Sequence, residues 1–289
     1  MPQENWQRWG ADDELGTLNL ITRDKAVEAA SLVVTGEIFA LGQPLSPGTP
    51  VSGHRAGISH FMGRDGGDYA AGAQRPDGFQ FAEDTLILPL HSGTHIDALC
   101  HVWYEDKLYN GFPGDSIRST VGAQHCGADK LQPIFSRGVL LDVEGVCGRL
   151  ANGTTIGRSM IEAAVREAGT EIKAGDAVLI RTGWLENYGA GKVDFGTEIG
   201  IDVEAGLWLA EAGASLIGAD NFAIEVLPFP AATVFPVHKR LIRDYGLALL
   251  EGLVLDGLAR AGAKTFLFVA TPLSIIGATA SPVNPVAVL

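Results

Sequence analysis

The sequence predicts an α/β fold in which helices cover a largely buried sheet, and three observations support this prediction. Beyond residue 135 one unit recurs: an amphipathic run, a glycine where a helix would end, and an apolar stretch of four to seven residues. Helices that alternate with such strands indicate layers around a buried sheet. The 289-residue chain is 46% hydrophobic and 19% charged, which is sufficient for a large core. We expect a single domain, residues 1–289, because no stretch has the composition of a linker.

The domain is expected to begin with an extended N-terminal segment, residues 1–36. This segment contains the first expected helix, residues 22–36. Thr22 is the residue type preferred at an N-cap, and Gly36 is the type that commonly ends a helix.

The next part of the chain is less regular. A strand is expected at residues 37–45, and strand character returns at residues 84–90. Between them, residues 42–80 are rich in Gly, Pro, Ser and Asp, which indicates a long irregular or hairpin-bearing segment. A segment of this length in a compact domain is more often functional than idle.

The second half of the chain supplies the alternating elements. Glycines close the amphipathic runs, and each run leads into an apolar strand. The expected strands are residues 137–146, 175–184, 214–220, 247–253 and 263–272. The expected helices are residues 159–169, 202–213, 238–246 and 255–262.

Residues 91–101, HSGTHIDALCH, contain three of the seven histidines of the chain. In an extended strand alternate side chains share a face, so that His91, Gly93, His95 and Asp97 would project together. A helix would also place His91 next to His95, but a preceding proline, the glycine and two β-branched residues make a helix costly here. We therefore expect a strand.

Two imidazoles and one carboxylate suit zinc, manganese or iron better than calcium or magnesium. Three protein ligands leave coordination positions for water, which is typical of catalytic sites. His101, four residues beyond Asp97, could bind a second ion or act as an acid or base beside the first. The alternative is that these polar residues only form a hydrogen-bond network at the surface.

The same segment matches the H-x-G-T-H-x-D-x-x-x-H pattern of the metal-dependent cyclase-like hydrolases. Their members include kynurenine formamidase, isatin hydrolase and a trans-dienelactone hydrolase. FPVHKRLIRDYGLALLEGL resembles the downstream segment of that family, and IGADNFAIE resembles its strand-end aspartate segment. The resemblance covers most of residues 37–275. Leu99 departs from it, because formamidases and isatin hydrolases commonly carry proline at this position.

The resemblance implies a swivelling β/β/α-type layered domain with a mixed sheet. It also implies one or two divalent ions per subunit, manganese or zinc. The residues that match the ligands of the first ion are His91, His95 and Asp97. The residues expected around a second ion are His101, His238 and Glu251.

His238 and Glu251 also fit the expected layout of the elements. His238 starts a predicted helix, and Glu251 ends a predicted strand, where α/β sheets place their sites. Without the resemblance, we would favour the interpretation of His238 as a surface histidine and of Glu251 as a solvated glutamate, and the resemblance shifts the balance towards a function. The resemblance implies that His101, or Glu251 in its place, transfers a proton during catalysis.

Together these features predict a hydrolase that uses metal-activated water. Its substrate would be a small cyclic or aromatic compound with an amide, ester or lactone bond. One alternative is a metal-dependent lyase or cyclase that acts on a small carbonyl compound. Another is a metal-binding protein without catalytic activity. The motifs of nicotinamide, nucleotide and serine-hydrolase sites are absent from the sequence.

Several residues near the motif have two readings each. Cys100 is next to His101, but adjacent residues of a strand point to opposite faces, so we expect a buried small side chain rather than a nucleophile. Trp103, Tyr104 and Tyr109 could form an aromatic wall of a substrate pocket, or they could belong to the core.

More distant polar residues are also open to interpretation. His54 and His60 could border the pocket or lie in a solvated loop. Asp220 is expected to cap the turn that follows it. Residues 277–285 have the composition of a turn and could close over the site or contact another subunit.

A net charge of −13 argues against nucleic-acid or anionic-membrane partners, because these require basic patches. No apolar stretch reaches the ~18 residues of a membrane helix, and the first residues lack the pattern of a signal peptide. Three cysteines are few and odd in number, as expected for free thiols in the cytoplasm. We expect a cytoplasmic enzyme with a small-molecule substrate, which forms a homo-oligomer (a dimer or tetramer).

Overall fold

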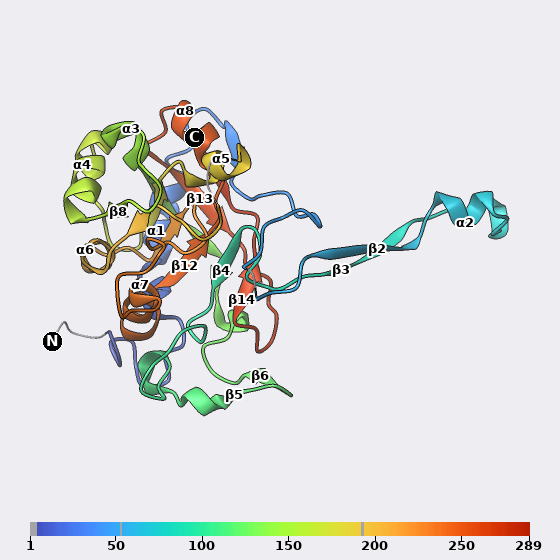
Figure 1. Cartoon of the computed structure of the whole chain (residues 1–289), viewed down its shortest axis with the longest axis horizontal. Coiled ribbons are helices and arrows are strands. Elements are labelled where there is room, and N and C mark those ends of the chain that lie inside the picture. The colour runs from blue at the N-terminus through green and yellow to red at the C-terminus, as the bar shows by residue number, and fades with distance from the viewer. Residues whose placement is uncertain (1–4, 53, 192–193) are drawn as a thin grey trace.

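A mixed sheet forms the centre of the computed structural model, which describes residues 5–52, 54–191 and 194–289 (Figure 1). Within these residues the sheet has nine strands in the order β1-β15-β13-β7-β9-β11-β12-β4-β14, and it is curled. The strands are β1 (Ile38–Ala40), β4 (His95–Asp97), β7 (Ile134–Asp142), β9 (Ala177–Arg181), β11 (Leu216–Ala219), β12 (Ala248–Glu251), β13 (Thr265–Ala270), β14 (Ala280–Pro282) and β15 (Val286–Val288).

Strands β7, β9, β11 and β12 run parallel, whereas the other neighbours in the sheet are antiparallel. Each parallel step requires a crossover connection, and helical segments supply it. The middle strands β11 and β12 are buried along their whole length. The α/β fold with a mixed, largely buried sheet is therefore confirmed.

Helices α1, α4 and α6 and a π-helix form the main cover of this sheet. Helix α1 packs against β7 and β13, α4 packs against β7 and α6, and the π-helix packs against α6. The helices are α1 (Arg23–Ala30), α2 (Gly66–Ala70), α3 (Val143–Cys147), α4 (Arg158–Ala168), α5 (Trp184–Gly189), α6 (Val203–Glu211), α7 (Pro236–His238), the π-helix (Lys239–Asp244) and α8 (Asp256–Arg260). Among the residues described, no helix is long and apolar enough to cross a membrane.

Short elements complete the fold. The 3₁₀ turns are Gly16–Leu20, Pro76–Gly78, Tyr109–Gly111, Gly114–Ser116 and Ala128–Lys130. Two minor strand pairs are β5 (Ile117–Arg118) with β6 (Gly122–Ala123), and β8 (Thr155–Ile156) with β10 (Gly200–Ile201).

The start of the first helix was predicted correctly, whereas its end was not. Thr22 is the N-cap, and its side chain accepts a hydrogen bond from the backbone of Lys25. The helix ends at Ala30, however, and not at Gly36. The β-branched residues that follow favour extended structure, and the backbone N–H groups of Thr35 and Gly36 both donate to the carbonyl oxygen of Leu289. Tertiary contacts therefore end the helix early.

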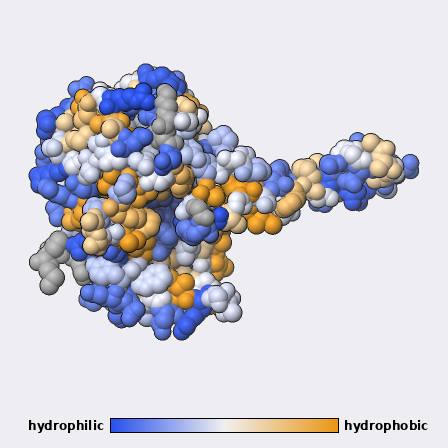
Figure 2. Space-filling view, viewed as in Figure 1, coloured by the Kyte–Doolittle hydropathy of each residue, from blue (hydrophilic) through white to orange (hydrophobic). Residues whose placement is uncertain are grey.

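A two-stranded arm extends from the body of the protein (Figure 1). It consists of β2 (Ser59–Arg64) and β3 (Glu83–Ile87), which pair in antiparallel fashion, and α2 lies near its tip. The hairpin confirms the hairpin-bearing segment predicted from composition. Figure 2 shows hydrophobic residues where the arm leaves the body. Exposed large hydrophobic residues of the arm are Phe61, Met62, Phe79, Leu86 and Ile87.

Candidate metal centre

The carboxyl end of β12 and the short strand β4 bring the candidate ligands together. The two strands are antiparallel, and their register places Glu251 opposite His95. Two glycines allow the chain to approach this closely. Gly93 has φ +58° and Gly252 has φ +67°, and a Cβ atom on Gly252 would lie only 2.8 Å from the carbonyl oxygen of Gly93. No larger residue fits there without a shift of the backbone.

The strand predicted for residues 91–101 was only partly correct. Residues 95–97 are extended, but residues 91–94 form bends around the left-handed Gly93. His91 therefore reaches the site from a bend and not by strand alternation. His101 returns to the site through a turn, in which its backbone N–H donates to the carbonyl oxygen of Ala98.

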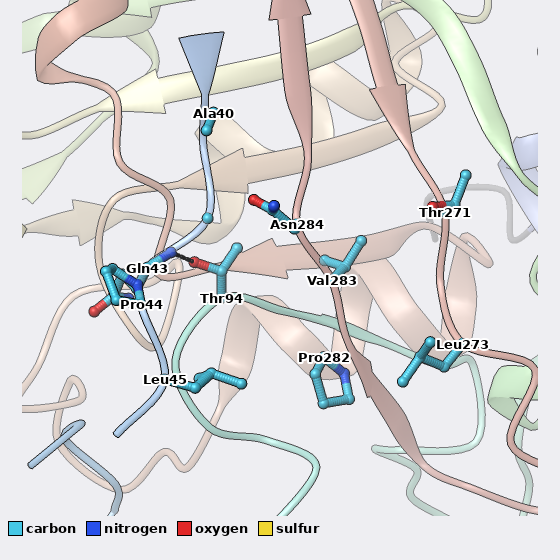
Figure 3. A pocket seen from close by; sticks show the side chains of 11 residues that line it. Ala40, Gln43, Pro44, Leu45, Thr94, Thr271, Leu273, Pro282, Val283 and Asn284 are labelled. Carbon is cyan, nitrogen blue, oxygen red and sulfur yellow. Dashed lines mark hydrogen bonds between the residues drawn. The ribbon is translucent and has the colours of Figure 1, made fainter. Parts of the chain in front are cut away.

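A set of hydrogen bonds next to β4 holds Thr94 and Gly252 together. The Thr94 hydroxyl donates to the carbonyl oxygen of Gly252 at 2.7 Å, and the Gln43 side chain donates to the same oxygen at 2.7 Å. The backbone N–H of Gln43 also donates to the Thr94 hydroxyl, as Figure 3 shows. Gln43 and Thr94 line a cavity of about 660 Å³, and none of the six candidate ligands is among its lining residues.

One set of donor atoms comes from the motif itself. Nδ1 of His91 lies 2.8 Å from Oδ1 of Asp97, and Nε2 of His101 lies 3.9 Å from Oδ2 of Asp97. One donor atom from each of the three side chains lies within 4.8 Å of the others. The rings of His91 and His101 are adjacent, with 3.9 Å between their centroids.

A second set shares Asp97 and adds the two residues from distant segments. Nε2 of His238 lies 3.6 Å from Oδ2 of Asp97 and 3.1 Å from Oε1 of Glu251. Nε2 of His95 lies between the sets, 3.7 Å from Oδ1 of Asp97 and 3.2 Å from Oε2 of Glu251. The six predicted residues therefore converge, but they divide differently from the two ligand triads that we expected. Asp97 belongs to both sets.

The buried polar atoms of this cluster are poorly satisfied by the protein. His95 and Asp97 are each at most 1% exposed. Nε2 of His95 and both carboxylate oxygens of Asp97 make no hydrogen bond of normal geometry within the described part of the chain. Burial of such groups is costly unless they are paired or coordinate a cation. Imidazole nitrogen and carboxylate oxygen are ligands of borderline divalent ions, so the donor set fits such an ion.

The carboxylates of the cluster are held in their charged form. Burial favours the neutral acid of Asp97, but its electrostatic interactions with His101 and His91 outweigh this effect and keep its pKa far below the usual range. Burial and the charge of Asp97 likewise raise the pKa of Glu251, yet the hydrogen bond from His238 and the close contact with His95 lower it overall.

The pKa values of the histidines shift in different directions. Burial lowers the pKa of His238 and of His95, but the close contacts of both rings with glutamates reverse this effect. Contacts with Glu225 and Glu251 raise the pKa of His238 to about 10, and contact with Glu251 raises the pKa of His95. Burial lowers the pKa of His101 to about 4. The imidazole of His101 is therefore neutral at pH 7.

Outer partners orient the donor rings. Nδ1 of His238 donates to Oε1 of Glu225 at 2.6 Å, and Glu225 also accepts the backbone N–H groups of His238 and Val237. Nε2 of His91 is hydrogen-bonded to the hydroxyl of Thr279 at 3.0 Å. Such partners fix the orientation of metal-binding histidines. Sequence reading missed both, although the acidic residue in the apolar run NFAIE was a usable signal for Glu225.

A cavity of about 690 Å³ opens onto His91, His101, His238 and Glu251. Phenylalanines supply much of its wall, and a buried glutamate, Glu198, also lines it. The phenylalanines are Phe195, Phe222, Phe229 and Phe235.

The aromatic wall that we considered for this cavity was wrong. Trp103, Tyr104 and Tyr109 are not among the lining residues. Tyr104 donates a hydrogen bond to Asp244, and Tyr109 is fully buried and donates to Asp13. The aromatic side chains of the wall come instead from the segments around β10 and before α7.

The structure also locates the remaining candidate residues. His54 lines the cavity, whereas His60 lies on the arm and pairs with Asp84 at 2.7 Å. Cys100 is buried, as expected for a core residue.

Asp220 does not cap the turn that follows it. Its carboxylate accepts hydrogen bonds from Thr182 and Gly183, and so ties the ends of β9 and β11 together.

The fold and the cluster define a class: a mixed α/β protein that gathers buried histidines and carboxylates at the carboxyl end of a central strand. Comparison with known proteins identifies the family. Residues 39–226, more than half of the chain, match the family model described as "Putative cyclase". The chain belongs to this cyclase family.

Individual relatives agree with this assignment. Isatin hydrolase of Roseibium aggregatum is 30% identical over 226 residues, which cover 74% of this chain and 77% of that protein. Kynurenine formamidase of Salinibacter ruber is 27% identical over 216 residues, which cover 70% and 77%. A crystal structure described as a novel cyclase is 36% identical, covers 99% of this chain and 100% of its own, and superimposes with a TM-score of 0.92.

Proposed function

We propose that this protein is a metal-dependent hydrolase that cleaves an amide, ester or lactone bond of a small cyclic or aromatic compound. One observation carries the proposal: six nitrogen and oxygen donors converge at the base of a cavity whose wall is rich in phenylalanine. The relatives support the enzyme class, because two of them are a formamidase and a hydrolase.

The proposed ligands of one or two manganese or zinc ions come from the six residues of the cluster. They are His91, His95, Asp97, His101, His238 and Glu251. A divalent ion bound there would polarise a carbonyl group and lower the pKa of water. Asp97 belongs to both donor sets and would therefore be the most important single ligand.

In this proposal His101 is the residue that transfers a proton. Its ring is neutral near pH 7 and its side chain is about a quarter exposed, so it can take up a proton and reach the cavity. Glu251 is the alternative acid–base group. His238 holds its position through Glu225, which accepts a hydrogen bond from Nδ1 and so orients the ring.

The substrate would lie among the phenylalanines. An aromatic ring gains from burial against such a wall and from edge or offset contacts with its rings. Phe195 and Phe222 already make such a contact, with centroids 4.9 Å apart. The cavity thus favours a small aromatic compound over a long or highly charged one.

Two other functions compete with the proposal: a metal-dependent lyase or cyclase, and a metal-binding protein without turnover. The test is elemental analysis, followed by a screen of lactones, isatin and N-formyl aromatic amines with and without chelator. A hydrolase incorporates one water into its product, whereas a lyase does not. Full activity after complete chelation would contradict the proposal, and metal content without turnover would favour the binding protein.

We further propose a single-domain subunit, residues 1–289, with an extended N-terminal segment, that works in the cytoplasm. Three cysteines without disulfides support this location. The subunits would form a dimer or tetramer through the arm. Its outer strand edges are free to pair with another arm, and it carries both positive and negative side chains, so that two copies can be complementary.

A further inference from the structure

A buried carboxyl group next to the candidate metal centre has no role in the proposed reaction. Glu198 is fully buried, and its backbone is fixed by two hydrogen bonds with Leu227, at 3.0 and 3.1 Å. Its Oε2 accepts the backbone N–H groups of Phe222 at 2.8 Å and Ala223 at 3.0 Å. Main chain and side chain are therefore both held in place.

The other oxygen, Oε1, is buried and has no hydrogen-bond partner among the described residues. Glu198 lines the same cavity as His101, His238 and Glu251, and its neighbours in the wall include Phe195 and Phe222. A buried polar atom without a partner destabilises the folded protein. A rigid, unpaired oxygen in the wall of a ligand cavity is therefore suited to a polar group of the ligand.

We propose that Glu198 is a specificity-determining residue that donates a hydrogen bond from Oε1 to an oxygen atom of an aromatic substrate. The inference rests on the proposed hydrolase function and narrows its substrate class. The preferred substrate would be an aryl amide or ester that carries a second carbonyl oxygen near the scissile bond. The phenylalanines would bind the ring, and Glu198 would set its orientation.

The geometry favours a donor over an acceptor. Oε2 already accepts two N–H groups, so the proton of the neutral acid belongs on Oε1. Burial and the nearby charge of Glu251 raise the pKa of Glu198 to about 8, so that the acid form prevails at pH 7. An ionised carboxylate at this position would face both the phenylalanines and a second carboxylate.

Two substitutions separate a donor from a merely structural residue. In Glu198→Gln the amide oxygen can take the place of Oε2, and the NH₂ group keeps a donor at the position of Oε1. Glu198→Leu has a similar size and no donor. Thermal unfolding and metal content are compared first. If the leucine variant does not fold, Glu198→Met replaces it.

The activity test uses N-formylaniline and its ortho-acetyl derivative with metal-loaded enzyme. We expect wild type and Glu198→Gln to prefer the ortho-acetyl compound, and Glu198→Leu to lose about tenfold in kcat/KM for that compound. N-formylaniline itself should be little affected. Equal losses in the glutamine and leucine variants, or no loss in either, would overturn the inference while the proposed function stands.

A binding experiment tests the role of Glu198 even if the protein shows no turnover. The metal-free protein is titrated with 2-aminoacetophenone and with 2-ethylaniline, which lacks the carbonyl oxygen. Wild type and Glu198→Gln should bind the ketone more tightly, and Glu198→Leu should bind the two equally. If metal-loaded wild type hydrolyses neither formanilide and none of the lactones, isatin and N-formyl aromatic amines of the wider screen, the proposed function fails by itself. If the ketone has no advantage in wild type, the inference fails.

Discussion

The candidate metal centre and the arm differ in the kind of side chain that each buries or exposes. The centre places charged side chains in the interior: Asp97 is fully buried, and His238 and Glu251 are at most 4% exposed. The arm places apolar side chains in solvent: Phe61 is 57% exposed and Ile87 is 60% exposed. Both arrangements are unfavourable for an isolated chain, since water is the preferred surrounding of a charge and the interior that of an apolar group.

The two regions also differ in how they are supported. Hydrogen bonds from several distant segments hold the centre, for example those that join Gln43, Thr94 and Gly252. The arm is held by its own strand pairing, and an isolated two-stranded hairpin is marginal in water. Our proposals assign a cation to the centre and another copy of the chain to the arm, and each of the two can be tested separately.

The largest effect is expected from Asp97→Asn, which removes the carboxylate shared by both donor sets. The loss of turnover should exceed the roughly 10²- to 10⁴-fold that one acid–base group contributes, because metal binding is lost as well. Metal content is measured by elemental analysis alongside kcat/KM. Asp84→Asn, which neutralises an exposed carboxylate of the arm, is the matched control and should leave both unchanged.

The second effect concerns His101. His101→Ala should lower turnover by about 10²- to 10⁴-fold with far less loss of metal, because the ring serves proton transfer. His54→Ala changes another histidine of the same cavity and should have only a small effect. If loss of metal accounts for all of the lost activity, His101 is a ligand and not the acid–base group.

The third effect concerns the arm. The double substitution of Phe61 and Ile87 by glutamate should shift the protein towards the monomer in light scattering coupled to gel filtration, because apolar contact area is replaced by charge. Metal content should remain unchanged. Val34→Glu alters an exposed apolar residue of the body and should keep the wild-type mass. A monomeric wild type would refute the proposed role of the arm.

The smallest effect is a pH dependence of stability that arises from Glu198. Its pKa of about 8 in the folded protein lies above the ordinary value of 4.5, so the folded state holds the extra proton between these values. Stability of the metal-free wild type should therefore fall as pH rises from 5 to 8, by at most about 1.4 kcal/mol per pH unit. Glu198→Gln lacks this contribution, so its stability relative to wild type should rise over the same range in urea titrations. A constant difference would mean that Glu198 is ionised throughout.

The sequence predicted those parts of the site that depend on local order. The motif residues His91, His95, Asp97 and His101 do meet, and Glu251 ends a strand as expected. Which donors are nearest to one another depends on the bends at residues 91–94 and on the turn that returns His101. Periodicity contains no information on such bends.

Several residues that reach the site through tertiary packing were not predicted. Glu198, Glu225 and the phenylalanine wall lie in irregular segments, and their approach to the motif is set by the order of strands in the sheet. Composition likewise indicated a hairpin after residue 42 but not its direction. Whether a hairpin folds back or extends depends on contacts that its sequence does not reveal.

The central claim is that the side chains around Asp97 bind a divalent cation, and anomalous diffraction tests it most directly. Crystals grown with manganese or zinc are measured above and below the absorption edge of that metal. The account predicts an anomalous peak about 2.0–2.2 Å from an oxygen of Asp97 and from nitrogen atoms of the surrounding histidines. A fully loaded crystal whose anomalous peaks all lie away from Asp97 would contradict it.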